Sequence, residues 1–379
     1  MSSSSTEATT EASINTQSDI GFTCQFTAGL RHVEASMVDH PLLTDDLACH
    51  LAGAKALGLA EQELASLSAQ QGPGKHLRVP ARSRLLDDAL KPPLQTLANT
   101  GSSCNVVALG AGMDTRPWRL RQTSSLSAVH WYDVDFPAIV ELKRKLLARA
   151  RAETGRNERT SEDATASSPA ASSSSADASA SALTPLLTTP VSPVTTPPGA
   201  STQDPDSSAA CAQQSDSPPQ QQGASIPQSS FPLLTASWTA VPHDLADGSL
   251  AAALEVAGFN SHLPTIWLAE AVLYYMPVAQ AAGVLQMAAS LSHPGSALLA
   301  TCVDAELLQA SRDLQAGHVF ANLFQFEIDE LLRDGLGQHW TVQRPPETTK
   351  VLAARLLGAD CYVAEYGGAE CMFTAVLTP

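Results

Sequence analysis

Four acidic residues stand where the strands of a predicted α/β sheet should end: Asp114, Asp135, Asp244 and Glu270. The carboxyl ends of parallel strands meet at one edge of a sheet, and ligands bind there. Glu270 interrupts the apolar run 265–276 and should therefore be at least half-buried. Because buried acids are rarely left unpaired, a cationic ligand would be a suitable partner for this side chain. For Asp244, capping a turn or short helix is an equally good explanation.

The segment Asn105–Leu120, NVVALGAGMDTRPWRL, should bring a ligand close to the backbone. Its apolar residues 106–109 predict a strand buried on both faces. Gly110 and Gly112 then break the strand, and the absence of a Cβ allows both a sharp turn and close approach of a ligand. The third glycine of GxGxxG is missing, so an ordinary strand-to-helix turn is the alternative.

A second signal lies about twenty residues further on, in the segment VHWYDVDFP. It predicts a second strand that ends in Asp133 and Asp135. An acid at this position can accept hydrogen bonds from both ribose hydroxyls of an adenosine group. Asp135 can also cap the helix that begins near Pro137, and the two roles are compatible.

The order of elements predicts an α/β fold with a mostly parallel sheet. Five strands alternate with helices, and two further strands near the C-terminus flank a helix over 348–357 and could pair as an antiparallel edge. We expect residues 1–20 to form a disordered tail. One folded domain should comprise 21–152 and 231–379. The Ser-, Ala-, Thr-, Pro- and Gln-rich residues 153–230 should form a disordered insertion between its two parts.

Composition excludes several classes of function. The net charge of −16 argues against nucleic acid or an anionic membrane surface as a partner. Seven scattered cysteines without CxxC spacing fit reduced thiols rather than a disulfide framework or a metal site. No apolar run approaches membrane-spanning length. The N-terminal residues carry acids and no arginine before Arg31, which disfavours a secretory signal and a transit peptide, so we expect a cytoplasmic protein.

Several motifs in order give the chain a resemblance to a known family. They are HPLLTDDLA, VPARSRLLDDAL, VVALGAGMDTRPWRL, YDVDFPAIVELKRKLL, VPHDL and PTIWLAEAVLYYMP. Together they resemble the leucine carboxyl methyltransferase-like family of class I S-adenosylmethionine (SAM) methyltransferases, and more closely its bacterial-type O-methyltransferase branch. The resemblance covers most of residues 25–305 outside the insertion. It implies a Rossmann-like fold with seven strands, helices on both faces of the sheet and an N-terminal helical cap.

The resemblance also implies a role for individual residues. Arg82 would bind the carboxylate of SAM, and the turn Gly110–Ala111–Gly112 would approach its methionyl and ribose parts. Asp135 would hold the ribose hydroxyls. The family's lysine near the N-terminus has no counterpart here, and Gln25 and Arg31 are the nearest polar residues.

The remaining implied contacts concern the adenine and the sulfonium. Asp244 and the backbone of Leu245 would meet the adenine, and Glu270 would lie near the methionyl end and the sulfonium. Tyr274 and Tyr275 could line an apolar pocket for the methyl acceptor, although core packing is the usual role of such residues.

The expected reaction is methyl transfer to a carboxylate or hydroxyl oxygen of a small molecule or a protein C-terminus. A carboxylate needs no general base, whereas a hydroxyl would be helped by one. The histidines in plausible loops are His243, His293 and His318, and the sequence places none of them on the acceptor, so no catalytic residue is identified. The alternatives are an NAD-type oxidoreductase and a non-catalytic SAM-binding protein that uses its insertion for interactions. No metal is expected.

Overall fold

The computed structural model describes residues 4–72, 75–99, 101–121, 126–166, 231–314, 323–337, 339–358 and 369–378. Contacts divide the chain into two units, Met1–Glu158 with Ser229–Pro379, and Arg159–Gln228. The sheet and every residue of the candidate site belong to the first unit. The expected insertion falls outside the described residues beyond residue 166.

The described residues form one mixed sheet with the strand order β3-β2-β1-β4-β5-β8-β6 and with β7 paired to β8. Strands β1 to β5 are parallel, as the alternation of strands and helices predicts. The carboxyl ends of β1 and β2 are in register, with Leu109 opposite Val134, so the segments that follow them emerge at one edge. The strands are β1 (Cys104–Leu109), β2 (Val129–Asp135), β3 (Ser237–Pro242), β4 (Thr265–Ala269), β5 (Ala297–Val303), β6 (Trp340–Val342), β7 (Glu347–Thr348) and β8 (Glu370–Leu377).

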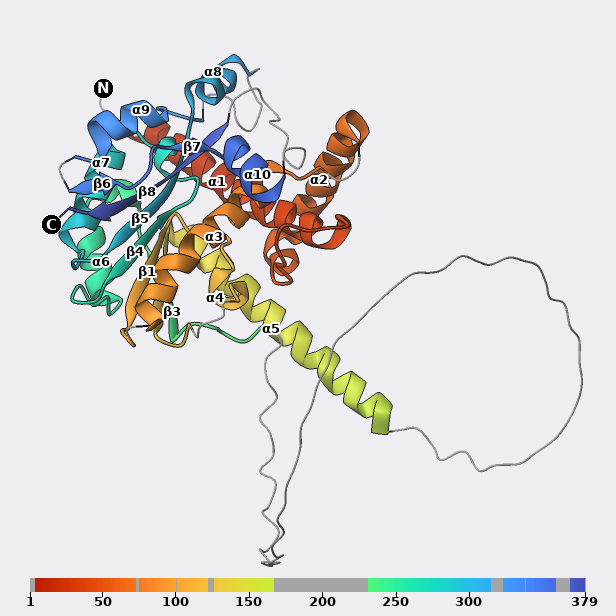
Figure 1. Ribbon diagram of the computed structural model, residues 1–379. Helices are drawn as coiled ribbons and strands as arrows, with labels where there is room; N and C mark the ends of the chain where they lie inside the picture. Colours follow the sequence, from red (N-terminus) through yellow and green to blue (C-terminus); the bar gives the residue numbers. More distant parts are fainter. Residues whose placement is uncertain are drawn as a thin grey trace, which may run out of the picture. The chain divides into compact units, whose positions relative to one another are not determined.

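Helices precede, connect and follow these strands (Figure 1). The longer ones are α1 (Ser4–Met37), α2 (Ala48–Gln71), α3 (Arg78–Asn99), α5 (Pro137–Ala166) and α7 (Val278–Ser290). The shorter ones are α4 (Arg116–Arg119), α6 (Leu250–Val256), α8 (Ala305–Asp313), α9 (Ile328–Glu330) and α10 (Thr349–Leu357), together with the 3₁₀ turns η1 (Leu245–Asp247) and η2 (Leu273–Tyr275) and the π-helical turn η3 (Leu331–Gly335).

The hydrophobic core lies on both faces of the sheet because successive strand residues point to opposite sides. In β1, Val106 and Ala108 pack with Leu86 and other residues of α3. Val107 and Leu109 pack on the opposite side with residues of α6 and α7. All six residues of β1 are buried, and its residues 106–109 form the continuous apolar run that burial on both faces favours.

The C-terminal part of the sheet is antiparallel. β8 lies between β5 and β6 and runs antiparallel to both. This confirms the pairing expected for the last two strands around a helix. The described residues contain eight strands rather than the predicted seven, because the two-residue strand β7 also pairs with β8.

Two helices extend beyond their predicted bounds. α1 begins at Ser4, within the expected disordered tail. Residues 4–20 contain neither glycine nor proline, the residues most unfavourable inside a helix. α5 continues to Ala166, so the first residues of the expected insertion are helical. Alanine, arginine and glutamate recur over 150–163, and their high helix propensity favours this continuation.

Candidate functional site

Asp135 closes β2 and holds the turn that follows β1. Its Oδ2 accepts a hydrogen bond from the backbone N–H of Gly112 at 2.6 Å, and its Oδ1 accepts one from the N–H of Phe136 at 2.7 Å. Burial raises the pKa of Asp135 to about 6, although both backbone N–H groups act to lower it. The residue therefore supports the start of α5 and the glycine turn, and its pKa lies close to neutral pH.

The two glycines of this turn are required for different structural reasons, because a Cβ at each position would meet a different neighbour. Gly110 has φ +60°, and a Cβ there would lie 2.4 Å from Cγ2 of Val272. Gly112 has φ +48°, and a Cβ there would lie 3.1 Å from Sγ of Cys24 in α1. Gly110 is thus required by the packing of the β1 and β4 loops, a role that the sequence did not suggest. Ala111 adds an N–H hydrogen bond to the carbonyl of Val134, which joins the turn to β2.

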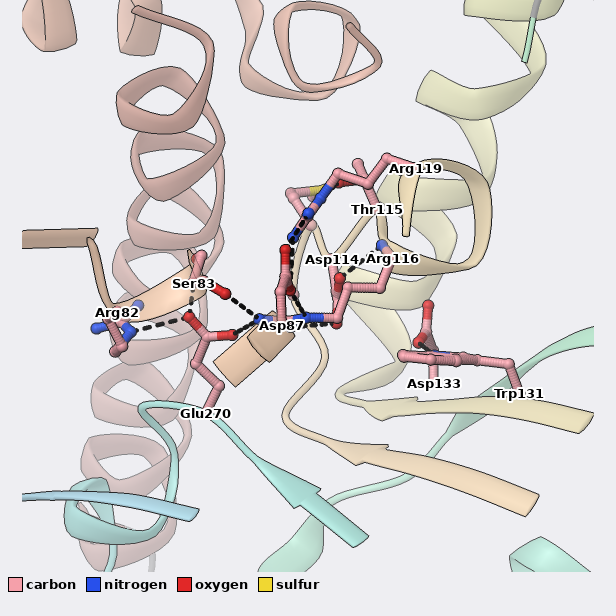
Figure 2. Close-up of polar contacts among 12 residues, drawn as sticks. Arg82, Ser83, Asp87, Asp114, Thr115, Arg116, Arg119, Trp131, Asp133 and Glu270 are labelled. Atoms are coloured by element: carbon pink, nitrogen blue, oxygen red, sulfur yellow. Dashed lines mark hydrogen bonds and ion pairs between the residues drawn. The ribbon is translucent and has the colours of Figure 1, made fainter. Parts of the chain in front are cut away.

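Glu270, directly after β4, lies between two arginines (Figure 2). Its Oε1 accepts from Nε of Arg82 at 2.9 Å and from Oγ of Ser83 at 3.0 Å. Its Oε2 accepts from Nη2 of Arg116 at 2.7 Å. Burial acts to raise the pKa of Glu270, but Arg116 and Arg82 hold that pKa well below its usual range. The expected partnering of this buried acid is achieved within the protein itself.

Arg116 connects Glu270 to two further acids. Its Nε donates to Asp87 at 2.6 Å and its Nη1 donates to Asp114 at 2.8 Å. Arg119, one turn later, also donates to Asp87 and lies 3.4 Å from Asp45. The side chain of Arg116 is 2% exposed, so these acids surround a fully buried cation.

We call the connected set the arginine–carboxylate network. Beyond the contacts above, Nε of Arg31 in α1 donates to Asp45 at 2.8 Å, and Nη1 of Arg82 donates to both oxygens of Glu370 at 2.7 and 3.0 Å. Four arginines and five acids give it a formal charge of −1. Its members are Arg31, Asp45, Arg82, Asp87, Asp114, Arg116, Arg119, Glu270 and Glu370.

Several of these residues were not singled out from the sequence. One signal was available within α3, where Ser83 and Asp87 lie one turn apart and are buried together with Arg82. Asp88, the next residue, instead pairs with Arg84 and Lys91 at the half-exposed side of the same helix. No local pattern identifies Glu370, because its partner Arg82 lies 288 positions earlier in the chain.

Glu370 also connects this network to the aromatic residues expected near the acceptor. The hydroxyl of Tyr274 donates to Oε1 of Glu370 at 2.7 Å. The rings of Tyr274, Tyr275 and Phe324 form a cluster with centroid separations of 4.7, 5.0 and 6.0 Å. Burial, and then the negative charge of Glu370, raise the pKa of Tyr274, and burial raises the pKa of Tyr275 to about 12. Both phenols therefore stay protonated at neutral pH.

The residues expected near adenine lie after β3. Asp244 is exposed and caps η1, with its side chain accepting from the N–H of Ala246 at 2.9 Å, whereas Leu245 is buried. The capping alternative for Asp244 is thus present in the structure. His243 is buried, and its backbone N–H donates to the backbone carbonyl of Asp135. The ring nitrogen Nε2 of His243 has no hydrogen-bond partner among the described residues.

The other polar candidates have separate positions. The ring of His293 contacts the carbonyl of Pro294, and His318 lies outside the described residues. Gln25 donates to the carbonyl of Leu51 at 3.5 Å. Arg31 donates to the carbonyl of Met113 at 2.6 Å, which brings α1 onto the glycine turn.

The chemistry of this edge of the sheet fits SAM, whose charged groups sum to +1. Among the described residues, Nη2 of Arg82 makes no hydrogen bond and can donate to a carboxylate. Each oxygen of Asp135 accepts a single N–H and keeps a lone pair for a ribose hydroxyl. The formal charge of −1 on the network suits a cationic ligand.

The described residues contain neither a candidate metal cluster nor a helix suited to crossing a membrane. No cluster of three or more histidine, cysteine, aspartate or glutamate side chains there could hold a metal ion. In the same part of the chain, none of the helices combines the length and the apolar character needed to cross a membrane.

Solved structures of several proteins resemble this chain. A DUF574 family protein from Streptomyces avermitilis MA-4680 aligns with a TM-score of 0.44 and 11% identity over 92% of this chain and 96% of its own. A proposed methyltransferase from Thermobifida fusca YX aligns with a TM-score of 0.43 and 14% identity over 87% and 92%. Magnesium protoporphyrin IX methyltransferase from Synechocystis PCC 6803, with bound S-adenosylhomocysteine, aligns with a TM-score of 0.35 and 11% identity over 84% of this chain and 95% of its own.

The sheet order, the glycine turn after β1 and the acid that closes β2 form a Rossmann-like α/β fold. A sequence match specifies the class further. Residues 25–289, which are 265 of the 379, match the family described as leucine carboxyl methyltransferase. The chain belongs to this family, whose cofactor is SAM.

Proposed function

We propose that this chain transfers the methyl group of SAM to an oxygen atom, and that the acceptor oxygen belongs to a carboxylate. The observation that carries this proposal is the arginine–carboxylate network next to the tyrosines Tyr274 and Tyr275. SAM supplies the activated methyl group, and the protein supplies binding, orientation and exclusion of water.

The protonation states of this region favour a carboxylate acceptor. The raised pKa values of Tyr274 and Tyr275 keep both phenols protonated, and the lowered pKa of Glu270 makes its carboxylate a weak base. A hydroxyl acceptor would need a group that takes its proton, whereas a carboxylate is already ionised at neutral pH. The family is named for methylation of a carboxyl group, which agrees with this proposal.

We assign the cofactor contacts as follows. Nη2 of Arg82 holds the carboxylate of SAM, and Asp135 accepts from the ribose hydroxyls beside the turn Gly110–Ala111–Gly112. Glu270 acts through Arg82 and Arg116, because its hydrogen bonds among the described residues all come from protein donors, and its charge lies near the sulfonium.

The remaining assignments concern the adenine and the acceptor. The exposed Asp244 and the backbone of Leu245 meet the adenine, and Tyr275 with Phe324 borders the acceptor. The acceptor is a small molecule or a protein C-terminus.

The domain comprises residues 21–152 and 231–379, and a cytoplasmic location stays a prediction.

Calorimetric titration tests the cofactor assignment. SAM and S-adenosylhomocysteine should bind the wild-type protein, and Asp135→Ala should weaken both at least tenfold, or about 1.4 kcal/mol. Glu141→Gln is the matched control, because Glu141 is exposed on α5 and pairs only with the exposed Lys145 among the described residues. Absence of binding to the wild-type protein would contradict the proposal.

Labelled methyl transfer tests the acceptor class. Candidate acceptors would be incubated with SAM that carries a radioactive methyl group, and the products would then be treated with alkali. Methyl esters release volatile labelled methanol under these conditions, whereas methyl ethers keep the label. Alkali-stable products would contradict a carboxylate acceptor.

A further inference from the structure

The last strand of the sheet contributes a residue to the proposed cofactor site. Glu370 begins β8 and lies beyond residue 289, where the family match ends. Its side chain is 1% exposed. A carboxylate at this depth requires partners, and the described residues provide Arg82 and Tyr274.

Two of the three contacts of Glu370 restrict the guanidinium of Arg82. Glu370 uses both oxygens on Nη1, while Glu270 uses Nε, so two sides of the planar group are fixed by charged partners. The hydroxyl of Tyr274 in turn fixes Glu370 at 2.7 Å. Charge-assisted bonds of this kind combine strength with directional specificity.

We propose that Glu370 is a positioning residue that orients Arg82, so that Nη2 of Arg82 is presented to the carboxylate of the cofactor. This inference rests on the proposed function, in which Arg82 binds that carboxylate. Among the described residues Glu370 contacts Arg82 and Tyr274, so in this proposal it acts through Arg82. Glu370 of the C-terminal strand β8 thereby determines the orientation of the Arg82 guanidinium, which belongs to helix α3.

A pair of ligands isolates the contact with the carboxylate. S-adenosylhomocysteine and its decarboxylated form, S-adenosyl-3-thiopropylamine, share the adenosine, the sulfur and the amino group. Their Kd values would be measured by calorimetry for the wild-type protein and for Glu370→Gln. We expect Glu370→Gln to weaken S-adenosylhomocysteine about tenfold and to leave the decarboxylated ligand unchanged, because loss of orientation affects only the carboxylate contact.

Two further variants make the result decisive. Tyr274→Phe removes the hydroxyl donor without changing any charge, and it should weaken S-adenosylhomocysteine about threefold with the same selectivity. In an Arg82→Met background, Glu370→Gln should have no further effect on the ratio of the two Kd values. If Glu370→Gln does not fold, Tyr274→Phe decides the question by the same ratio.

The outcomes separate the two proposals. If the wild-type protein binds neither ligand, the proposed function fails and this inference fails with it. If the wild-type protein prefers S-adenosylhomocysteine and Arg82→Met abolishes that preference, the cofactor assignment stands. In that case an unchanged ratio in Glu370→Gln and Tyr274→Phe, or tighter binding of S-adenosylhomocysteine, would overturn the positioning role alone.

Discussion

Asp135 and Glu270 occupy similar places and have opposite electrostatic surroundings. Asp135 is the last residue of the parallel strand β2, and Glu270 directly follows the parallel strand β4, at the same edge of the sheet. Asp135 is held by two backbone N–H groups, and burial raises its pKa to about 6. Glu270 is held by two guanidinium groups, which keep its pKa well below the usual range.

The comparison shows which partner can offset the cost of burying a charge. A backbone N–H is a dipole, and two of them do not fully compensate the lost hydration of the Asp135 carboxylate. A guanidinium is a full charge with several donors, and Arg82 and Arg116 together compensate Glu270. Of these two acids, Asp135 therefore titrates near neutral pH, whereas Glu270 stays ionised.

Removing the charge of Glu270 should have the largest effect. Glu270→Gln leaves Arg82 and Arg116 buried with one fewer carboxylate, and breaking a buried pair in this way costs about 3 kcal/mol of unfolding free energy. Urea denaturation, followed by tryptophan fluorescence, would measure the loss.

An exposed ion pair provides the matched control for Glu270→Gln. Arg355 and Glu347 lie 2.5 Å apart at the surface, so Glu347→Gln should give no measurable change. Equal effects of the two substitutions would show that burial does not distinguish these pairs. A stability loss below about 1 kcal/mol in Glu270→Gln would contradict our account of the network.

The pH dependence of cofactor binding should report Asp135. The ribose hydroxyls need the ionised carboxylate as acceptor, and protonation removes acceptor capacity. Because the pKa of Asp135 is raised to about 6, affinity for S-adenosylhomocysteine should rise with pH up to that value and become constant above it. Below the pKa the slope should approach about tenfold per pH unit. Calorimetry between pH 5 and 8 would measure it.

Asp135→Asn is the control for this titration. The amide cannot ionise, so binding should be weaker and should lose its dependence on pH over the same range. A slope that persists in Asp135→Asn would assign the titration to another group. A wild-type profile without a slope would indicate that the carboxylate is ionised throughout, as Glu270 is.

The sequence predicted the parts of the site whose partners are close in the chain or in the sheet. The strand Cys104–Leu109, the glycine turn and Asp135 all depend on local periodicity and on the parallel register of β1 and β2. Of the two roles expected for Asp135, capping is compatible with its contact to Phe136, and binding of the ribose hydroxyls stays a prediction. Its contact with the N–H of Gly112 was not expected.

The network around Glu270 could not be predicted in the same way. Arg82 and Arg116 lie 188 and 154 positions from Glu270, and sequence patterns do not specify contacts across such separations. The sequence did indicate that Glu270 would be buried and paired, but it suggested a ligand as the partner. Glu370 had no local signal, since an acid at the start of a strand that the sequence places at the edge of the sheet also suits solvent.

The smallest expected effect concerns the backbone beside Glu270. Ala271 has φ +52°, the one positive value among the described non-glycine residues, and its N–H donates to Oγ1 of Thr301 at 2.9 Å. No such value follows Asp135, so strain distinguishes the two strand ends. Ala271→Gly should raise the unfolding free energy by about 0.5 kcal/mol, because relief of the left-handed alanine exceeds the entropy that glycine gains on unfolding.

Ala269→Gly tests whether the gain at Ala271 comes from backbone strain. Ala269 is the last residue of β4 and is fully buried without a positive φ, so glycine there should cost about 1 kcal/mol. Thermal unfolding of both variants and of the wild-type protein would give the two signs. If Ala271→Gly destabilised the protein as much as Ala269→Gly does, the left-handed alanine would store no strain. The ends of β2 and β4 would then differ only in the partners of their acids, which are backbone N–H groups for Asp135 and guanidinium groups for Glu270.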